Sequence, residues 1–148
     1  MIRFAAAAGF AAALAFPAIA DDHLTPAPDG ASVYFIGLAD GDKVRSPVTV
    51  RFGLKGMGVA PAGVEWDNTG HHHLLVNRPP LGEGELGAEE AVNPIPSDDN
   101  HLHFGGGQTE VDLELEPGTH TLQLVVGDYA HFPHDPPIVS DVITVTVQ

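Results

Sequence analysis

The chain has 148 residues, with 20 acidic side chains against six basic ones, nine histidines and no cysteine. Its formal net charge of −14, and the lack of any Lys or Arg after Arg78, exclude nucleic-acid binding through a basic patch. The lack of cysteine excludes disulfides, thiolate metal sites and thiol catalysis, and two methionines are too few for a methionine-rich copper(I) carrier.

The first twenty residues have the form of a secretory signal peptide. Met1–Arg3 is a short basic start, residues 4–16 are apolar and rich in alanine, and residues 17–20 supply small side chains for cleavage. The apolar stretch is too short for a comfortable membrane span, so we expect no stable span after cleavage. This pattern predicts a periplasmic or secreted protein.

The remaining chain divides into a leader and one domain. Residues 21–30 contain two prolines and are predicted to form a flexible leader. Residues 31–148 are long enough to bury a hydrophobic core without stabilisation by disulfides. Without Arg3 the formal net charge becomes −15, which suits an exported protein and also attracts cations.

Short segments with alternating apolar and polar residues follow in chain order. In Val48–Leu54 the apolar residues occupy every second position, with Thr49 and Arg51 between them, as in a half-buried strand. The strands predicted in this way cover residues 31–38, 48–54, 71–77, 109–115, 119–126 and 139–147.

This pattern predicts an all-β protein, an immunoglobulin-like or fibronectin-like antiparallel β-sandwich of about seven strands. The turn at residues 115–122 (LEPGTHTL) is typical of the corner between the fifth and sixth strands of such a domain. A cupredoxin-like barrel is the alternative. The longest irregular segment, residues 78–100, has room for one helical turn at 89–92, and loops of this length are usually functional or disordered.

Six histidines occur as three closely spaced pairs. On a strand, a His-x-His pair directs both rings to one face, within reach of one ion. Imidazole is a common ligand of zinc and copper(II). We therefore expect Cu(II) or Zn to bind at a site drawn from these pairs, with Asp99, Asp128 or Asp135 orienting a ring. The six candidate ligands are His71, His73, His101, His103, His131 and His134.

Two further histidines are predicted to be structural. His72 shares its strand face with Leu74 and Val76, which predicts a core or edge histidine. His120 points inward next to Leu122, in the position of a corner residue that bonds a backbone carbonyl.

Other functions remain open at this stage. In one alternative, the protein is a structural or interaction module whose histidines only stabilise loops. A metal-dependent enzyme is the weakest alternative, because no Gly-x-Ser-x-Gly elbow, nucleophile or general base stands out. The Gly105–Gly107 run does not precede a helix and is no phosphate loop.

Four blocks of the chain resemble, in the same order, a family known as domain of unknown function 4399. They are residues 70–75 (GHHHLL), 103–109 (HFGGGQT), 117–124 (PGTHTLQL) and 131–137 (HFPHDPP). The resemblance covers roughly residues 71–148 and implies an exported bacterial protein. It implies no activity.

Overall fold

The computed structural model describes residues 23–148, and the expected signal peptide lies outside the described residues. In this part of the chain, nine strands and one short helix follow each other. They are β1 (Ser32–Ile36), β2 (Lys43–Val44), β3 (Val48–Lys55), β4 (Gly58–Val59), β5 (Thr69–Val76), α1 (Gly84–Glu90), β6 (His101–His103), β7 (Glu110–Leu113), β8 (Gly118–Gly127) and β9 (Ile143–Val147).

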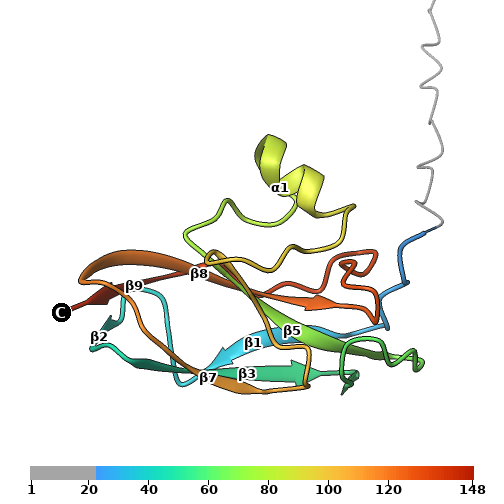
Figure 1. Ribbon diagram of the computed structural model, residues 1–148, viewed down its shortest axis with the longest axis horizontal. Coiled ribbons are helices and arrows are strands. Elements are labelled where there is room, and N and C mark those ends of the chain that lie inside the picture. The colour runs from blue at the N-terminus through green and yellow to red at the C-terminus, as the bar shows by residue number, and fades with distance from the viewer. Residues whose placement is uncertain (1–22) are drawn as a thin grey trace, which may run out of the picture.

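The strands form two sheets that pack face to face (Figure 1). One sheet has the order β1-β3-β7, and the other has the order β2-β9-β8-β5-β4, with β6 paired to β5. The long strands pair in antiparallel fashion, while the two-residue strands β2 and β4 run parallel to β9 and β5. The predicted antiparallel sandwich is confirmed, and the strand count exceeds seven because of the short strands.

The strand order is that of an immunoglobulin-like domain. In such domains strands A, B and E share one sheet, and C, F and G share the other. Here β1, β3 and β7 take the places of A, B and E, and β5, β8 and β9 take those of C, F and G. The corner predicted before β8 is present, because His120 Nε2 lies 2.8 Å from the carbonyl oxygen of Glu116, four residues upstream. The half-buried His120 thus makes the backbone bond that a tyrosine makes in many immunoglobulin-like domains.

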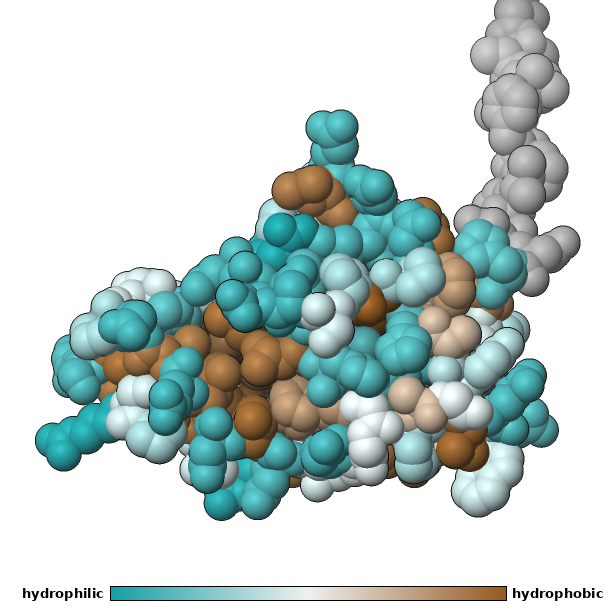
Figure 2. Space-filling model, in the orientation of Figure 1, coloured by the Kyte–Doolittle hydropathy of each residue, from teal (hydrophilic) through white to brown (hydrophobic). Residues whose placement is uncertain are grey.

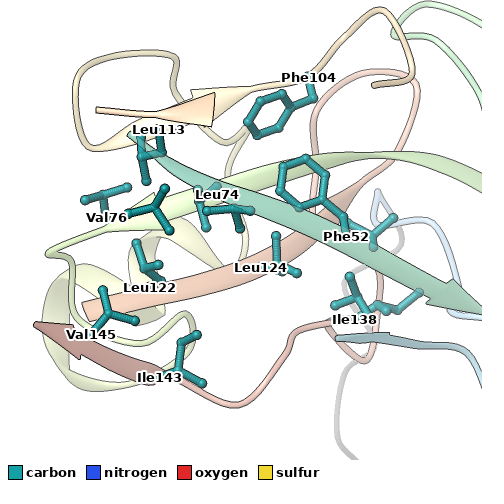
Figure 3. Close-up of a cluster of buried hydrophobic side chains, with 14 residues drawn as sticks. Phe52, Leu74, Val76, Phe104, Leu113, Leu122, Leu124, Ile138, Ile143 and Val145 are labelled. Atoms are coloured by element: carbon teal, nitrogen blue, oxygen red, sulfur yellow. The ribbon is translucent and has the colours of Figure 1, made fainter. Parts of the chain in front are cut away.

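The core lies between the sheets (Figure 3). Strand β3 contributes Val48, Val50 and Phe52, all buried, while the intervening Thr49 and Arg51 are exposed, as the alternation predicted. Leucine and valine side chains of β5 and β8 face them from the other sheet. Figure 2 shows a mostly hydrophilic face, whose most extensive hydrophobic area lies at the level between the sheets, with smaller hydrophobic spots elsewhere.

Residues 78–100, here called the covering loop, lie over the outer face of the larger sheet (Figure 1). Leu81 and Ile95 of the loop pack against Leu75 and Val125 of the sheet. The loop contains α1, which begins before the helical turn expected at residues 89–92 and ends within it, so that prediction was wrong in position. Because the loop covers this face, β5 is buried on both sides from Gly70 to Val76.

Part of the leader contacts the domain. Ala27 N donates a hydrogen bond to Asp135 O, and Asp135 N donates one to Thr25 O. The Thr25 hydroxyl also donates to Asp128 Oδ2 at 2.7 Å. These bonds join residues 25–27 to the loop that carries His131. Among residues 23–148, no helix has the length and hydrophobicity needed to cross a membrane.

Candidate metal centre

Strand pairing brings three of the candidate histidines together. His71 and His73 lie on the same face of β5 because they are two residues apart on one strand. His103 of β6 is directly opposite His73 in the antiparallel ladder. On the other side of β5, His71 is opposite Gly127, the last residue of β8. The loop that follows Gly127 contributes His131.

The four rings form one cluster at the end of the larger sheet. The centroid of the His71 ring lies 4.8 Å from that of His73, and 5.1 Å from those of both His103 and His131. The His103 and His131 centroids are 4.8 Å apart. The His73 centroid lies 5.1 Å from His103 and 6.0 Å from His131. We call these four residues the histidine cluster.

A tight turn holds His131 in place. His131 has a φ of 73°, in the left-handed region, and its N–H donates to the carbonyl oxygen of Asp128. Oδ1 of Asp128 accepts the N–H groups of Ala130 and Phe132, at 2.8 and 2.9 Å. The covering loop contributes as well, since Ile95 N donates to His131 O at 2.9 Å. The buried Asp128, one of the three predicted orienting aspartates, therefore shapes the turn without touching an imidazole nitrogen.

Two glycines leave space for the rings. A Cβ added to Gly127 would lie 2.8 Å from His73 Nε2. A Cβ added to Gly105 would lie 2.3 Å from Cε1 of His103. These contacts are closer than side-chain atoms tolerate, so both positions require glycine for the observed packing. This role of the two glycines was not predicted from the sequence. The available signal was the position of Gly127 directly after the predicted strand at residues 119–126.

Burial makes the inner imidazoles neutral. The pKa of His71 is lowered from 6.5 to about 4 by desolvation and by the neighbouring His103 and His131. The pKa of His73 is lowered to about 2 by desolvation and by His71. Desolvation and the nearby His131 also lower the pKa of His103. At neutral pH these rings are therefore uncharged, so a metal ion can bind a ring nitrogen without first displacing a proton.

The ring nitrogens are incompletely satisfied by hydrogen bonds. Nε2 of His73 and Nε2 of His71 lie 3.0 Å apart, so one ring donates to the other. Among the described residues, Nδ1 of His71, Nδ1 of His73 and Nε2 of His103 are buried without a hydrogen-bond partner. Buried polar atoms of this kind are rare and often mark a site for water or an ion.

The cluster has suitable dimensions for a transition metal. One ring nitrogen from each of His71, His103 and His131 lies within 4.8 Å of the other two. Tetrahedral nitrogen ligands of zinc lie about 3.4 Å from each other, given a Zn–N distance of about 2.0–2.1 Å. Side-chain shifts of about 1 Å would therefore close these three rings around one ion, and the ring of His73 lies next to those of His71 and His103.

The other two candidate ligands lie apart from the cluster. His101 is opposite Leu75, further along the ladder, and its Nδ1 and Nε2 lie 2.8 Å from Asp98 Oδ1 and 3.2 Å from Glu90 Oε1. His134 is buried, and its Nδ1 lies 3.3 Å from the carbonyl oxygen of Val126. Both rings are occupied by their neighbours, so these two residues are not part of the set that the fold brings together.

His72 has the structural position expected for it. It is fully buried on the opposite face of β5, with its ring centroid 5.2 Å from that of Phe52. Desolvation lowers its pKa.

Of the remaining predicted orienting residues, Asp135 uses its backbone to pair with residues 25–27. The carboxylate that accepts a hydrogen bond from a candidate histidine, His101, is that of Asp98 instead of its neighbour Asp99.

The fold and the cluster together define a small immunoglobulin-like sandwich with four imidazoles gathered at one end. The chain belongs to the family described as Domain of unknown function (DUF4399), whose profile matches residues 50–148, about two thirds of the chain. The match includes all four residues of the histidine cluster and confirms the resemblance seen in the sequence. No curated protein and no solved structure was found to match the chain.

Proposed function

We propose that this protein binds one divalent transition-metal ion, Zn(II) or Cu(II), through His71, His103 and His131, with His73 as the fourth ligand. The observation that carries the proposal is the convergence of four imidazoles from β5, β6 and the loop after β8. Neutral imidazole is the protonation state that these metals require, and burial favours it at His71 and His73.

The contrast between the histidines supports a metal ligand role over a purely structural one. Histidines that only stabilise loops are expected to bond backbone carbonyls or carboxylates, as His120, His134 and His101 do. In the histidine cluster the rings contact chiefly one another. Three of their buried nitrogens have no partner among residues 23–148, as is also true of both ring nitrogens of the core residue His72. Gathering neutral rings in this way is costly unless something binds their lone pairs.

The chemistry of the site favours holding an ion over performing a reaction. Four protein ligands complete a tetrahedral shell, which is typical of structural or storage sites, while catalytic zinc keeps a position open. The net negative charge of the chain raises the local concentration of cations. We therefore propose metal binding or buffering outside the cytoplasm as the function, in line with the expected export signal.

Equilibrium dialysis of tag-free protein, residues 21–148, against Zn(II) and Cu(II) tests the proposal. We expect one ion per chain. His103→Ala and His131→Ala should each weaken metal binding by tenfold or more, because each removes a ligand. Both rings are only partly buried, so the fold should tolerate their loss.

His120→Ala is the matched control, since it also removes a partly exposed imidazole but leaves the cluster intact. It should not change metal affinity. A stoichiometry well below one, or equal affinities in all three variants, would rule out the proposed site and favour a structural or interaction module.

A further inference from the structure

A groove of about 350 Å³ lies on the loops next to the histidine cluster. The segment that leads into β5 forms one side, and the turn after β8 together with Thr25 and Pro26 forms the other. Its volume is at the lower end of the range for small-molecule sites. The histidine ligands do not line it, so the metal proposal does not explain this feature.

The groove carries negative charge without a compensating cation. Glu65, Asp67 and Asp128 line it, while no Lys, Arg or His does. Within residues 23–148, none of these three carboxylates forms an ion pair. Asp128 is only 3% exposed, so one of the three charges is largely removed from water. Its carboxylate oxygens already accept hydrogen bonds from Thr25, Ala130 and Phe132, so the exposed Glu65 and Asp67 are the two carboxylates free to meet a cation.

Two aromatic rings stand at the same groove. Trp66, the sole tryptophan of the chain, is 72% exposed, and Tyr129 is 41% exposed. The turn that presents Trp66 is fixed, because the Thr69 hydroxyl donates to Trp66 O at 2.8 Å and Gly58 N donates to Asn68 O. The backbone of Tyr129 is held by Gly63 N, which donates to Tyr129 O. Exposed aromatic faces beside carboxylates are the combination that recognises ammonium groups.

We infer that this groove binds an alkylammonium group, held by cation–π contact with Trp66 and Tyr129 and by the charges of Glu65 and Asp67. The chemistry is shared by small quaternary or primary amines and by a lysine side chain on another protein. The inference does not depend on metal binding, since it uses none of the cluster histidines.

The fluorescence of Trp66 reports on this site directly, because no other indole contributes. Metal-free protein would be titrated with choline and, separately, with its uncharged carbon analogue 3,3-dimethylbutan-1-ol at matched ionic strength. We expect a saturable change with choline in the millimolar range or below and none with the alcohol. A short lysine-containing peptide and its norleucine counterpart form the second arm, and whichever amine binds more tightly identifies the source of the ammonium group.

Charge-neutral variants separate this site from general electrostatics. Glu65→Gln and Asp67→Asn should each weaken choline binding, and together by about tenfold. Glu114→Gln, an exposed carboxylate beyond the end of β7, should leave binding unchanged. All of these variants should bind Zn(II) as the unmodified chain does. The absence of saturation with either amine, equal responses to the charged and uncharged compounds, or no effect of the double variant would each overturn the inference.

Discussion

At the scale of single residues, the histidine cluster depends on what lies beside each ring. Alternation on β5 gives His71 and His73 a common face, but the space for their rings exists because Gly127 and Gly105 have no side chains. Neighbouring imidazoles and burial then keep the inner rings neutral. The consequences can be measured with single substitutions.

Gly127→Ala places a methyl group only 2.8 Å from His73 Nε2. His73 is fully buried, so it has little room to move, and overpacking of this kind costs about 1–3 kcal/mol. We expect a loss of that size in the free energy of unfolding, measured by urea denaturation, together with weaker metal binding. Gly58→Ala is the control, since its nearest contact is 3.4 Å, and it should change stability by less than about 0.5 kcal/mol. Equal effects of the two substitutions would contradict the packing argument.

The metal-free protein should lose stability steadily in mild acid. The pKa of His71 is about 4 in the folded chain and about 6.5 when unperturbed, so its contribution is complete above pH 6.5. Between pH 6.5 and 4 the unfolded chain binds a proton that the folded chain does not, which removes about 1.4 kcal/mol per pH unit. His73 acts in the same direction over a wider range, down to about pH 2.

Urea denaturation at several pH values, with chelator present, measures this slope. In His73→Gln the proton that His73 takes up on unfolding is removed from the balance, so the slope between pH 6 and 4 should fall by about 1.4 kcal/mol per pH unit. An unchanged slope would mean that His73 is already accessible to protons in the folded state.

At the scale of elements, the covering loop connects the outer face of the sheet to the histidine cluster. Leu81 and Ile95 bury apolar surface against the sheet, and the backbone of Ile95 bonds His131. Glu90 at the end of α1 forms an ion pair with Arg78 and contacts His101, so one carboxylate links α1 to the start of the loop and to β6. The loop is thus a structural support for the cluster as well as a cover.

Glu90→Gln should loosen the loop without unfolding the sandwich. The change removes the charge that pairs with the partly buried Arg78, at an expected cost of about 1–3 kcal/mol. We expect faster amide hydrogen exchange over residues 78–100, including the Ile95 amide that bonds His131, while exchange in β3 and β8 stays slow. Glu85→Gln, on an exposed position of the same helix, is the control. If Ile95 stays protected in the Glu90 variant, the loop does not depend on this ion pair.

At the scale of the whole molecule, the immunoglobulin-like order explains why the cluster forms where it does. Strands β5 and β8 are central neighbours in the larger sheet, and their antiparallel pairing brings the start of one next to the end of the other. The loops before β5, after β6 and after β8 therefore meet at one end of the sandwich (Figure 1). A ligand bound there joins several elements, so its effect extends to the stability of the whole fold.

Metal saturation should raise the melting temperature of the whole domain. An ion that binds only the folded state adds about 2.7 kcal/mol at a free concentration one hundred times its Kd. Calorimetry with Zn(II) should show an increase that chelator reverses. The increase should be lost in His103→Ala but kept in His101→Ala, because the His101 ring bonds Asp98 and Glu90 away from the cluster. A similar increase in both variants would show that zinc acts elsewhere.

The sequence by itself determined the fold class, the family and the core. The alternation in Val48–Leu54 predicted which β3 side chains are buried, and the LEPGTHTL turn predicted the corner at His120. Both are local properties, since period-two patterns and turn residues act over only a few positions. It also predicted that His71 and His73 share a face, for the same reason.

Only the tertiary structure decided which histidines meet. Register and loop path are set by packing between segments far apart in the chain, and these put His103 opposite His73 but His101 beside Glu90. The same contacts seat His131 in the cluster and bury His134 against Val126. The three pairs looked equivalent in the sequence because spacing fixes only the face that a side chain takes, whereas its neighbours across the sheet come from the folded chain as a whole.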